Sequence, residues 1–427
     1  MTTAQSLFTQ LYQTLQQPIC LLLLQMLLIV LVSRLFGLLF VRFKQPAVIG
    51  EILAGIFLGV SVLGAVFPSF FHFIFPSSSF NTLEVLSKLG LAFFMFILGM
   101  ELDLQELRSK AKSVIIISQS SIVVPFIFGV ILAWFIFPYF QMPNIPFYVF
   151  AIFMGIALSI TAFPVLARIV KAKALQKTAL GTLALSAAAF ADIMAWCILA
   201  VIVAIAKAAS LLNASFIIFS AVIFILLMFK VVRPFLERII ARLRKAHYGD
   251  HNVVVISFIV LLLSAFIAEL IGIHMLFGAF LAGIIIPNND TLKHTLTAKL
   301  EDVSEVLLLP IFFAFTGLRL QIDLLNTPFL WAMSIIIIII AMLGKFIGSA
   351  LPAKALGMNW KDALSVGALM NTRGLMELVV LNIGYELKIL SPELFAILVL
   401  MALATTVITS PLLSIIQYMF KGKNLKG

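Results

Sequence analysis

The chain has 427 residues, of which 63% are hydrophobic and only 11% are charged, and its formal net charge is +11. Soluble domains carry about 25% charged residues, so this composition predicts an integral membrane protein and excludes an ordinary soluble domain. Both cysteines, Cys20 and Cys197, lie within apolar runs, which indicates neither a disulfide framework nor a metal site. No Lys or Arg precedes Arg34, so we expect no cleaved signal peptide.

Thirteen apolar segments of roughly membrane-spanning length follow one another along the chain and predict an all-α, polytopic membrane domain. The third, ninth and tenth look short for a straight span. The ninth follows the eighth after only a few residues, so we expect a tight connection there. The segments are 19–40, 46–67, 86–100, 114–137, 147–169, 178–206, 214–232, 253–271, 275–287, 306–320, 330–351, 363–383 and 394–418.

The basic residues alternate strongly between the two sides of these segments. Most of the 29 Lys and Arg residues fall in the loops after odd-numbered segments, which predicts an external N-terminus and a cytoplasmic C-terminus. Such an arrangement requires an odd number of crossings, in agreement with thirteen. The basic excess is therefore topological and contacts anionic lipid rather than nucleic acid. Without an organellar targeting segment, we expect a bacterial cytoplasmic (inner) membrane.

Asp192 is the only charged residue in segment 178–206. An ionised carboxylate at the bilayer centre costs roughly 2.5–3.5 kcal/mol on insertion scales, so such a residue normally faces a bundle interior or a water-filled cavity. The default interpretation is an ion or proton site. The alternative is a buried structural acid that pairs with a lysine.

The fifth and twelfth segments both contain helix-breaking sequences. In the fifth, Pro164 removes a helical hydrogen bond, and Ser159 and Thr161 offer hydroxyls to the freed backbone. In the twelfth, 371–374 (Asn-Thr-Arg-Gly) interrupts an apolar run. Irregular backbone at this depth must line a cavity or be buried in protein. Two breaks in oppositely oriented segments predict an inverted repeat with a midplane site between them, although ordinary kinks are the alternative.

Five motifs in a fixed order now support a family resemblance. The chain resembles the cation:proton antiporter-2 family of monovalent cation/proton exchangers, which includes Kef-type proteins and the plant cation/proton exchangers with their bacterial relatives. Each motif is weak to moderate alone, but the ordered set covers almost the whole chain. The motifs are 49–55 (IGEILAG), 159–168 (SITAFPVLAR), 191–196 (ADIMAW), 272–280 (GIHMLFGAF) and 370–378 (MNTRGLMEL).

The resemblance implies an inverted-repeat antiporter fold with two crossed, broken helices. It implies a core domain at about 84–206 and 301–420, and dimerisation or scaffold helices at about 19–67 and 214–287. It also implies a homodimer that works by elevator-like alternating access. The chain ends soon after its last segment, so we expect no soluble regulatory domain in cis, and a separate regulatory subunit stays an open question.

The resemblance also assigns roles to residues, with no enzymatic activity and no cofactor beyond the transported Na⁺ or K⁺ and H⁺. Asp192 is the expected carrier of cation and proton in turn. The family usually places a polar or acidic residue before this aspartate, and Ala191 departs from that pattern. A lone carboxylate predicts electroneutral exchange. Ser159, Thr161 and Asn371 are expected to supply further oxygen atoms.

The remaining candidates are charged or titratable residues in or beside the spans. Lys345 is expected beside the ion site, without a clear partner in the absence of a second acid, and snorkelling to an interface is its alternative. Arg373 and Glu377 share a helical face and are expected to compensate the dipole ends at the break, and the alternative is that Glu377 also lies near the ion pathway. Candidate pathway or pH-sensing residues are Glu51, Glu269 and His274, for which interfacial or plain loop positions are the alternatives.

Two other classes of transport protein remain open. A cation channel would use a similar polar pathway, although no repeated filter is present in the sequence. A sodium-coupled organic-anion symporter would share the broken-helix architecture, but it would need no obligatory proton carrier. The sequence supports no intramembrane enzyme, because it contains no paired aspartates on separate spans and no His-Glu-x-x-His. It leaves the choice between Na⁺ and K⁺ open.

Overall fold

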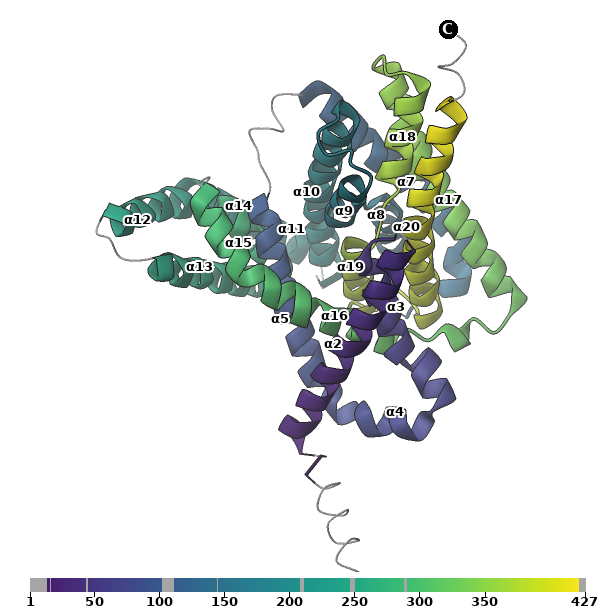
Figure 1. Ribbon diagram of the computed structural model, residues 1–427, viewed down its shortest axis with the longest axis horizontal. Helices are drawn as coiled ribbons and strands as arrows, with labels where there is room; N and C mark the ends of the chain where they lie inside the picture. Colours follow the sequence, from purple (N-terminus) through teal and green to yellow (C-terminus); the bar gives the residue numbers. More distant parts are fainter. Residues whose placement is uncertain are drawn as a thin grey trace, which may run out of the picture. The chain divides into compact units, whose positions relative to one another are not determined.

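The computed structural model describes residues 14–15, 17–43, 45–101, 111–143, 145–207, 211–245, 250–287 and 290–421, and within these ranges it contains helices and no strands (Figure 1). Ten described helices are long and apolar enough to cross a membrane, and one bent pair passes the same test as a single span. Two further apolar helices are shorter. The protein is therefore an integral, all-helical membrane protein.

Each of the thirteen predicted segments coincides with one of these helices or with the bent pair. Because two of the helices are short, the count of thirteen crossings stays a prediction. The expected shortness was correct for the ninth segment, where α14 (Met275–Ile285) has 11 residues. It was wrong for the third, where α5 (Phe80–Glu101) has 22 residues, and for the tenth, where the helical span is Leu296–Leu324.

Charged residues before the third and tenth segments explain this error, because both helices begin earlier than the apolar runs, at Phe80 and at Leu296. Glu84 and Lys88 interrupt the apolar pattern of α5, but they pair with each other one helical turn apart (2.8 Å) and keep the helix intact. Arg319, near the end of the tenth segment, also contacts Glu84 (3.5 Å). The second segment is the short one instead, because its helix ends at Leu58 and the backbone of Gly59 is extended.

The chain divides into two compact units, of which the first is Met1–Phe94 with Leu296–Gln321. Within it, α3 and α16 cross at glycines. A Cβ added at Gly55 would overlap the Phe313 carbonyl, and one added at Gly317 would overlap the Gly55 carbonyl, so the crossing requires glycine. The unit contains α2 (Pro18–Arg42), α3 (Ala47–Leu58), η1 (Val60–Gly64), α4 (Pro68–Ile74), η2 (Ser77–Ser79), η4 (Ser304–Leu308), α16 (Leu309–Arg319) and parts of α5 and of α15 (Asp290–Val303).

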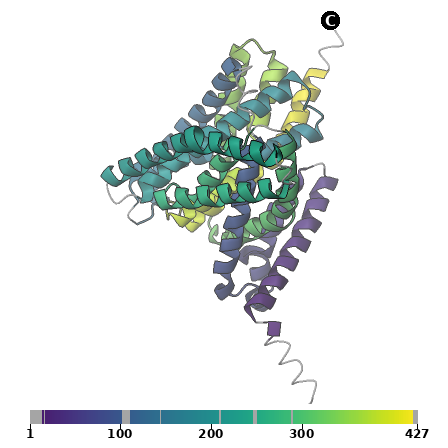
Figure 2. The same ribbon diagram turned by 90° about the vertical axis from the view of Figure 1, so that its left-hand side faces the viewer.

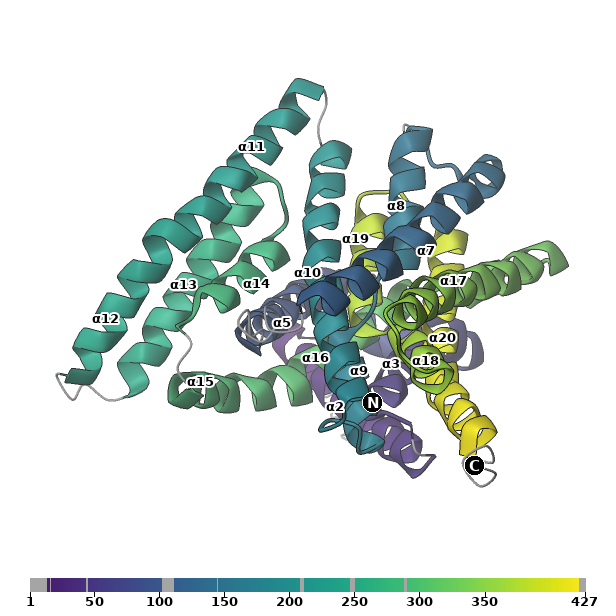
Figure 3. The same cartoon turned by 90° about the horizontal axis from the view of Figure 1, so that it is seen from above.

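The second unit is Met95–Thr295 with Ile322–Gly427, and it contains both predicted breaks. In its bundle, α7 packs against α8 and α17, and α18 packs against α17 and α20, as the view from above shows (Figure 3). The bundle consists of α7 (Ala111–Phe140), α8 (Phe147–Ser159), α9 (Phe163–Ala172), α10 (Ala179–Lys207), η5 (Ile322–Leu324), α17 (Pro328–Ala355), α18 (Trp360–Met370), α19 (Leu375–Glu386) and α20 (Pro392–Lys421).

The remaining helices of this unit form a separate layer. The run α11 (Leu211–Leu227), η3 (Met228–Val232) and α12 (Arg233–Lys245) lies beside α13 (Asp250–Ile271), and these are the two long teal helices of Figure 2. Only Gly272, Ile273 and His274 connect α13 to α14, so the expected tight connection is confirmed. Gly272 has φ +96°, a conformation that favours glycine.

The predicted boundary between a core domain and a dimerisation domain is a functional division. The structure does not test it, and it stays a prediction.

Candidate functional site

The fifth segment is broken between α8 and α9. Residues 160–162 are not helical, and Pro164 lies in the first turn of α9, where a missing N–H costs nothing. The Ser159 hydroxyl points at the Gly155 carbonyl (2.6 Å) and the Ile122 carbonyl (2.9 Å). The Ser159 hydroxyl is therefore hydrogen-bonded to backbone carbonyls, and its role as an ion ligand stays a prediction.

The twelfth segment is broken between α18 and α19, which meet at a bend of 41°. The break depends on Gly374, whose φ of 130° and ψ of −124° are accessible essentially only to glycine. The Thr372 hydroxyl donates to the Leu369 carbonyl (2.7 Å), and the Arg373 N–H donates to the Thr406 hydroxyl (3.1 Å). Side chains thus supply two hydrogen bonds to the backbone where the helix is interrupted.

The two breaks contact each other directly. The Ala162 N–H donates to the Thr372 carbonyl (2.9 Å), and the Thr161 hydroxyl donates to the Met370 carbonyl (3.3 Å). Residues more than 200 positions apart in the chain therefore share hydrogen bonds at one point of the second unit. The expected pair of crossed, broken helices is present, and we refer to residues 160–162 and 371–374 together as the crossing.

Asp192 lies on α10 beside the crossing and is only 3% exposed. Its Oδ2 atom accepts the backbone N–H of Phe163 (3.1 Å), the first residue of α9. The N-terminus of a helix favours negative charge because its N–H groups are unsatisfied and its dipole is positive there. The Oδ1 atom is buried and has no hydrogen-bond partner within the described part of the chain. One oxygen thus positions the carboxylate and the other is open to a ligand.

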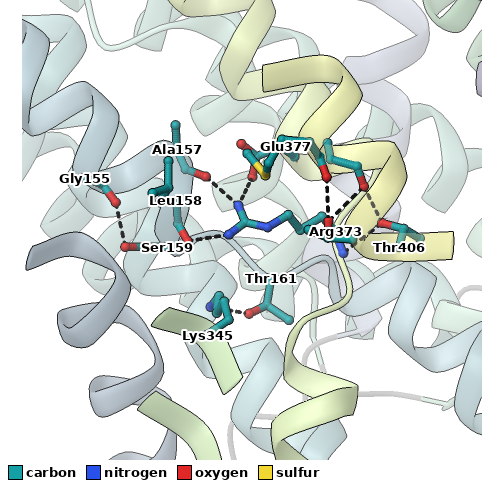
Figure 4. Close-up of polar contacts among 12 residues, drawn as sticks. Gly155, Ala157, Leu158, Ser159, Thr161, Lys345, Arg373, Glu377 and Thr406 are labelled. Atoms are coloured by element: carbon teal, nitrogen blue, oxygen red, sulfur yellow. Dashed lines mark hydrogen bonds and ion pairs between the residues drawn. The ribbon is translucent and has the colours of Figure 1, made fainter. Parts of the chain in front are cut away.

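Arg373 spans the gap between the two broken helices (Figure 4). Its guanidinium donates to the Ala157 carbonyl (2.6 Å), the Leu158 carbonyl (2.5 Å) and the Glu377 carboxylate (3.0 Å), and it is fully buried. The two carbonyls belong to the last turn of α8, where the helix itself supplies no donors. Glu377 lies in the first turn of α19, where negative charge is favoured. Both residues thus lie at helix ends of the sign that they favour, and their charge-compensating role in transport stays a prediction.

Lys345 lies on α17 and is fully buried, so the snorkelling alternative is wrong. Its ammonium donates to the Thr161 hydroxyl (2.6 Å) and the Ser121 carbonyl (3.0 Å). In the part of the chain that the structure describes, it forms no ion pair with Asp192, although the two charges are near enough to interact electrostatically. Its partners are thus a hydroxyl and a carbonyl rather than an acid.

Asn371 ends α18 and is fully buried, and neither polar atom of its amide has a partner among the described residues. Leaving such atoms unpaired is costly, so this amide is a suitable ligand for a bound cation. No three His, Cys, Asp or Glu side chains gather in the described ranges as a multivalent metal site would require.

The three candidates for pathway or pH-sensing roles lie elsewhere. Glu269 accepts the Met275 N–H (2.8 Å) and His274 accepts the Leu276 N–H (3.4 Å), so both side chains cap the N-terminus of α14. Glu51 is half-buried on α3, in the first unit. Capping explains Glu269 and His274 structurally, and the transport roles of all three stay predictions.

Sequence reasoning missed Ser121 and Thr406. Ser121 contributes a backbone carbonyl and Thr406 a hydroxyl, and their partners are 224 and 33 positions away in the chain. No local pattern marks such contacts. One signal was available for the first, because Pro125 lies within α7 and cannot donate a hydrogen bond to Ser121.

Comparisons with known proteins agree with this geometry. A family model described as "Sodium/hydrogen exchanger, transmembrane" matches residues 27–416. The Na(+)/H(+) antiporter NhaS4 of Synechocystis sp. is 43% identical, over 92% of this chain and 96% of its own length. Cation/H(+) antiporter 20 of Arabidopsis thaliana is 40% identical over 95% of this chain, and K(+)/H(+) antiporter 1 of Saccharomyces cerevisiae is 34% identical over 93%.

The chain spans about half the length of those plant and yeast relatives, 49% and 46% respectively. The sodium proton antiporter MjNhaP1 of Methanocaldococcus jannaschii has a similar solved structure, with a TM-score of 0.64 over 93% of this chain and 96% of that one. Its sequence identity is 14%, so this likeness concerns the fold alone.

Proposed function

Because the chain belongs to the sodium/hydrogen exchanger family, we propose that it exchanges a monovalent cation, Na⁺ or K⁺, for H⁺ across the membrane by alternating access. Asp192 binds the cation and the proton in turn. The proposal rests on the hydrogen bonding of this carboxylate. Oδ2 accepts the Phe163 N–H, while Oδ1 is buried and has no hydrogen-bond partner among the described residues.

The chemistry of a buried carboxylate explains the coupling. An ionised carboxylate away from water is costly unless something compensates its charge. A proton and a hard monovalent cation both do so, and they compete for the same oxygen. Asp192 is therefore disfavoured both without a bound ion and with a proton and a cation bound together. In the favoured forms it carries either one proton or one cation. The amide oxygen of Asn371 is the neutral oxygen atom proposed to complete the cation's shell, whereas the Thr161 hydroxyl accepts a hydrogen bond from the Lys345 ammonium and donates to the Met370 carbonyl.

We also propose that the exchange is electroneutral. Ala191 leaves Asp192 as a single carboxylate, and the other acid that is buried among the described residues, Glu377, is already paired with Arg373. One carboxylate that alternates between one proton and one monovalent cation moves no net charge per cycle. Transport that responds to membrane potential in liposomes, with permeant ions controlled, would contradict this part of the proposal.

The proposal includes an assembly and a location. The protein acts as a transporter without an enzymatic step or a cofactor, as a homodimer whose scaffold helices are at about 19–67 and 214–287. It lies in a bacterial cytoplasmic membrane with its N-terminus outside. The distribution of basic residues supports the orientation.

The test is cation-dependent dissipation of a preformed pH gradient in everted vesicles from an antiporter-deficient host. Pulses of KCl, NaCl and LiCl at several pH values identify the cation. Asp192→Asn is the matched control, because it keeps an oxygen acceptor for the Phe163 N–H and removes the charge. We expect the native response to disappear in this variant at equal expression. Retained exchange refutes the assignment, and a native protein without any response points to the symporter.

A further inference from the structure

Pro125 lies in the interior of α7, four residues after Ser121. A residue at this position of a regular helix would donate its N–H to the Ser121 carbonyl, but proline has no N–H to donate. The helix thus leaves the Ser121 carbonyl without its usual partner at the centre of the second unit. A buried carbonyl in this situation requires a donor from elsewhere.

Lys345 supplies that donor. Its ammonium lies 3.0 Å from the Ser121 carbonyl and 2.6 Å from the Thr161 hydroxyl. The Thr161 hydroxyl in turn donates a hydrogen bond to the Met370 carbonyl (3.3 Å). Lys345 is thereby linked to α7 on one side and, through Thr161, to the end of α18 on the other, by oxygen atoms that carry no formal charge.

The packing of α7 against α17 makes this contact possible. Gly344 and Gly348 are on α17 next to Lys345. A Cβ added at Gly344 would lie 3.0 Å from the Cα atom of Pro125, and one added at Gly348 would lie 2.8 Å from the Ser120 carbonyl. Larger residues would separate the two helices and move the ammonium away from the freed carbonyl.

Three charged groups act electrostatically on Lys345, namely Asp192, Glu377 and Arg373. Glu377 and Arg373 are joined in a buried ion pair. Asp192 is therefore the acid that remains for Lys345, yet its Oδ1 atom has no hydrogen-bond partner in the described ranges. The freed carbonyl and the Thr161 hydroxyl hold the ammonium in a position where it does not occupy the carboxylate.

We propose that Pro125 is a positioning residue for exchange: by freeing the Ser121 carbonyl it holds Lys345 away from Asp192 and leaves that carboxylate open to the incoming cation or proton. This inference rests on the proposed function. When the carbonyl also accepts an N–H from its own helix, the two donors compete for it, so the hydrogen bond of Lys345 weakens and the ammonium turns to Asp192. The cation then has to displace an ammonium before it can bind.

The test is Pro125→Ala, which restores the N–H and favours the helix, so the variant is expected to fold. We expect the KM for the cation to rise about tenfold, roughly the worth of one charge-assisted hydrogen bond, with the maximal rate retained at saturating cation. Pro138→Ala is the matched control, because Pro138 is an exposed residue of the same helix. It should leave the KM unchanged.

A second measurement covers the case in which Pro125→Ala loses transport. Cation binding stabilises the folded protein, so the purified variant in detergent should need about tenfold more cation for half of the maximal thermal shift. An unchanged midpoint, an unchanged KM, or an equal effect of Pro138→Ala overturns the inference. If the native protein exchanges cations and Pro125→Ala behaves like it, this inference alone fails. If the native protein shows no exchange, the proposed function fails.

Discussion

Replacing Arg373 with methionine removes the guanidinium that links the two broken helices while keeping a side chain of similar length. The Ala157 and Leu158 carbonyls lose their donors, at about 1–3 kcal/mol each. Glu377 becomes an unpaired buried carboxylate, at about 3–5 kcal/mol. Arg373 and Glu377 are both fully buried, so solvent does not screen the lost hydrogen bonds or the lost ion pair. The total is roughly 5–11 kcal/mol, comparable with the whole stability of many folded domains.

Thermal unfolding in detergent, followed by the yield of monodisperse protein, measures this loss. We expect Arg373→Met to give little folded protein at 37 °C. The control is the double variant Arg373→Met with Glu377→Leu. It still lacks donors for the two carbonyls but no longer contains an unpaired charge, so it should recover about 3–5 kcal/mol. A single variant that melts within a few degrees of the native protein, or a double variant no more stable than the single, would refute the reasoning.

Two further predictions follow from the crossing. Gly374→Ala places a Cβ at φ 130° and 3.1 Å from Val165, so it should destabilise the fold by about 1–3 kcal/mol and lower the melting temperature. The control Gly357→Ala, at φ 92° with no atom within 4 Å of its Cβ, should lower the melting temperature less. Thr161→Val removes the hydroxyl that links Lys345 to the Met370 carbonyl and should reduce cation-dependent proton flux at least tenfold. Thr161→Ser keeps the hydroxyl and should retain most of the flux. Equal flux in the two variants would argue against a role of this hydroxyl in transport.

The sequence predicted best those features that depend on residues close together in the chain. Apolar runs located every long helix, because a bilayer requires such runs. Helix lengths were less predictable, since Glu84 and Lys88 look like loop residues until their pairing within α5 is known. The breaks at 160–162 and 371–374 were predictable because a proline or a glycine coincides there with polar residues. Proline alone is not sufficient, since α7 continues through Pro125 and α20 through Pro411.

The site was predictable in its acid but not in its surroundings. Asp192 stands out because it is the only charge in its segment. The partners of Lys345 could not be predicted, because the Ser121 carbonyl is 224 positions away and backbone carbonyls are present at every residue. The capping roles of Glu269 and His274 have a local cause, the three-residue connection to α14, but they became visible only with the observed hydrogen bonds, and the pH-sensing role of these residues stays a prediction.

The charges at the crossing follow from the four helix ends that meet there. Arg373 is at the C-terminal end of α8 and Glu377 at the N-terminal end of α19, each with the sign that its helix end favours. Asp192 faces the N-terminal end of α9, and Lys345 reaches the last carbonyl of α18 through Thr161. Before a proton or cation binds, these side chains carry two positive and two negative charges, but Oδ1 of Asp192 has no hydrogen-bond partner among the described residues.

This balance bears on the coupling ratio. A proton and a monovalent cation each add one positive charge when they bind to Asp192, so both loaded forms carry the same charge. A second acid in place of Ala191 would change that, because the crossing would then hold one more negative charge with no helix end to compensate it. Ala191→Asp should therefore introduce sensitivity to membrane potential if it preserves transport, and one-for-one exchange is the outcome that the native set of charges favours.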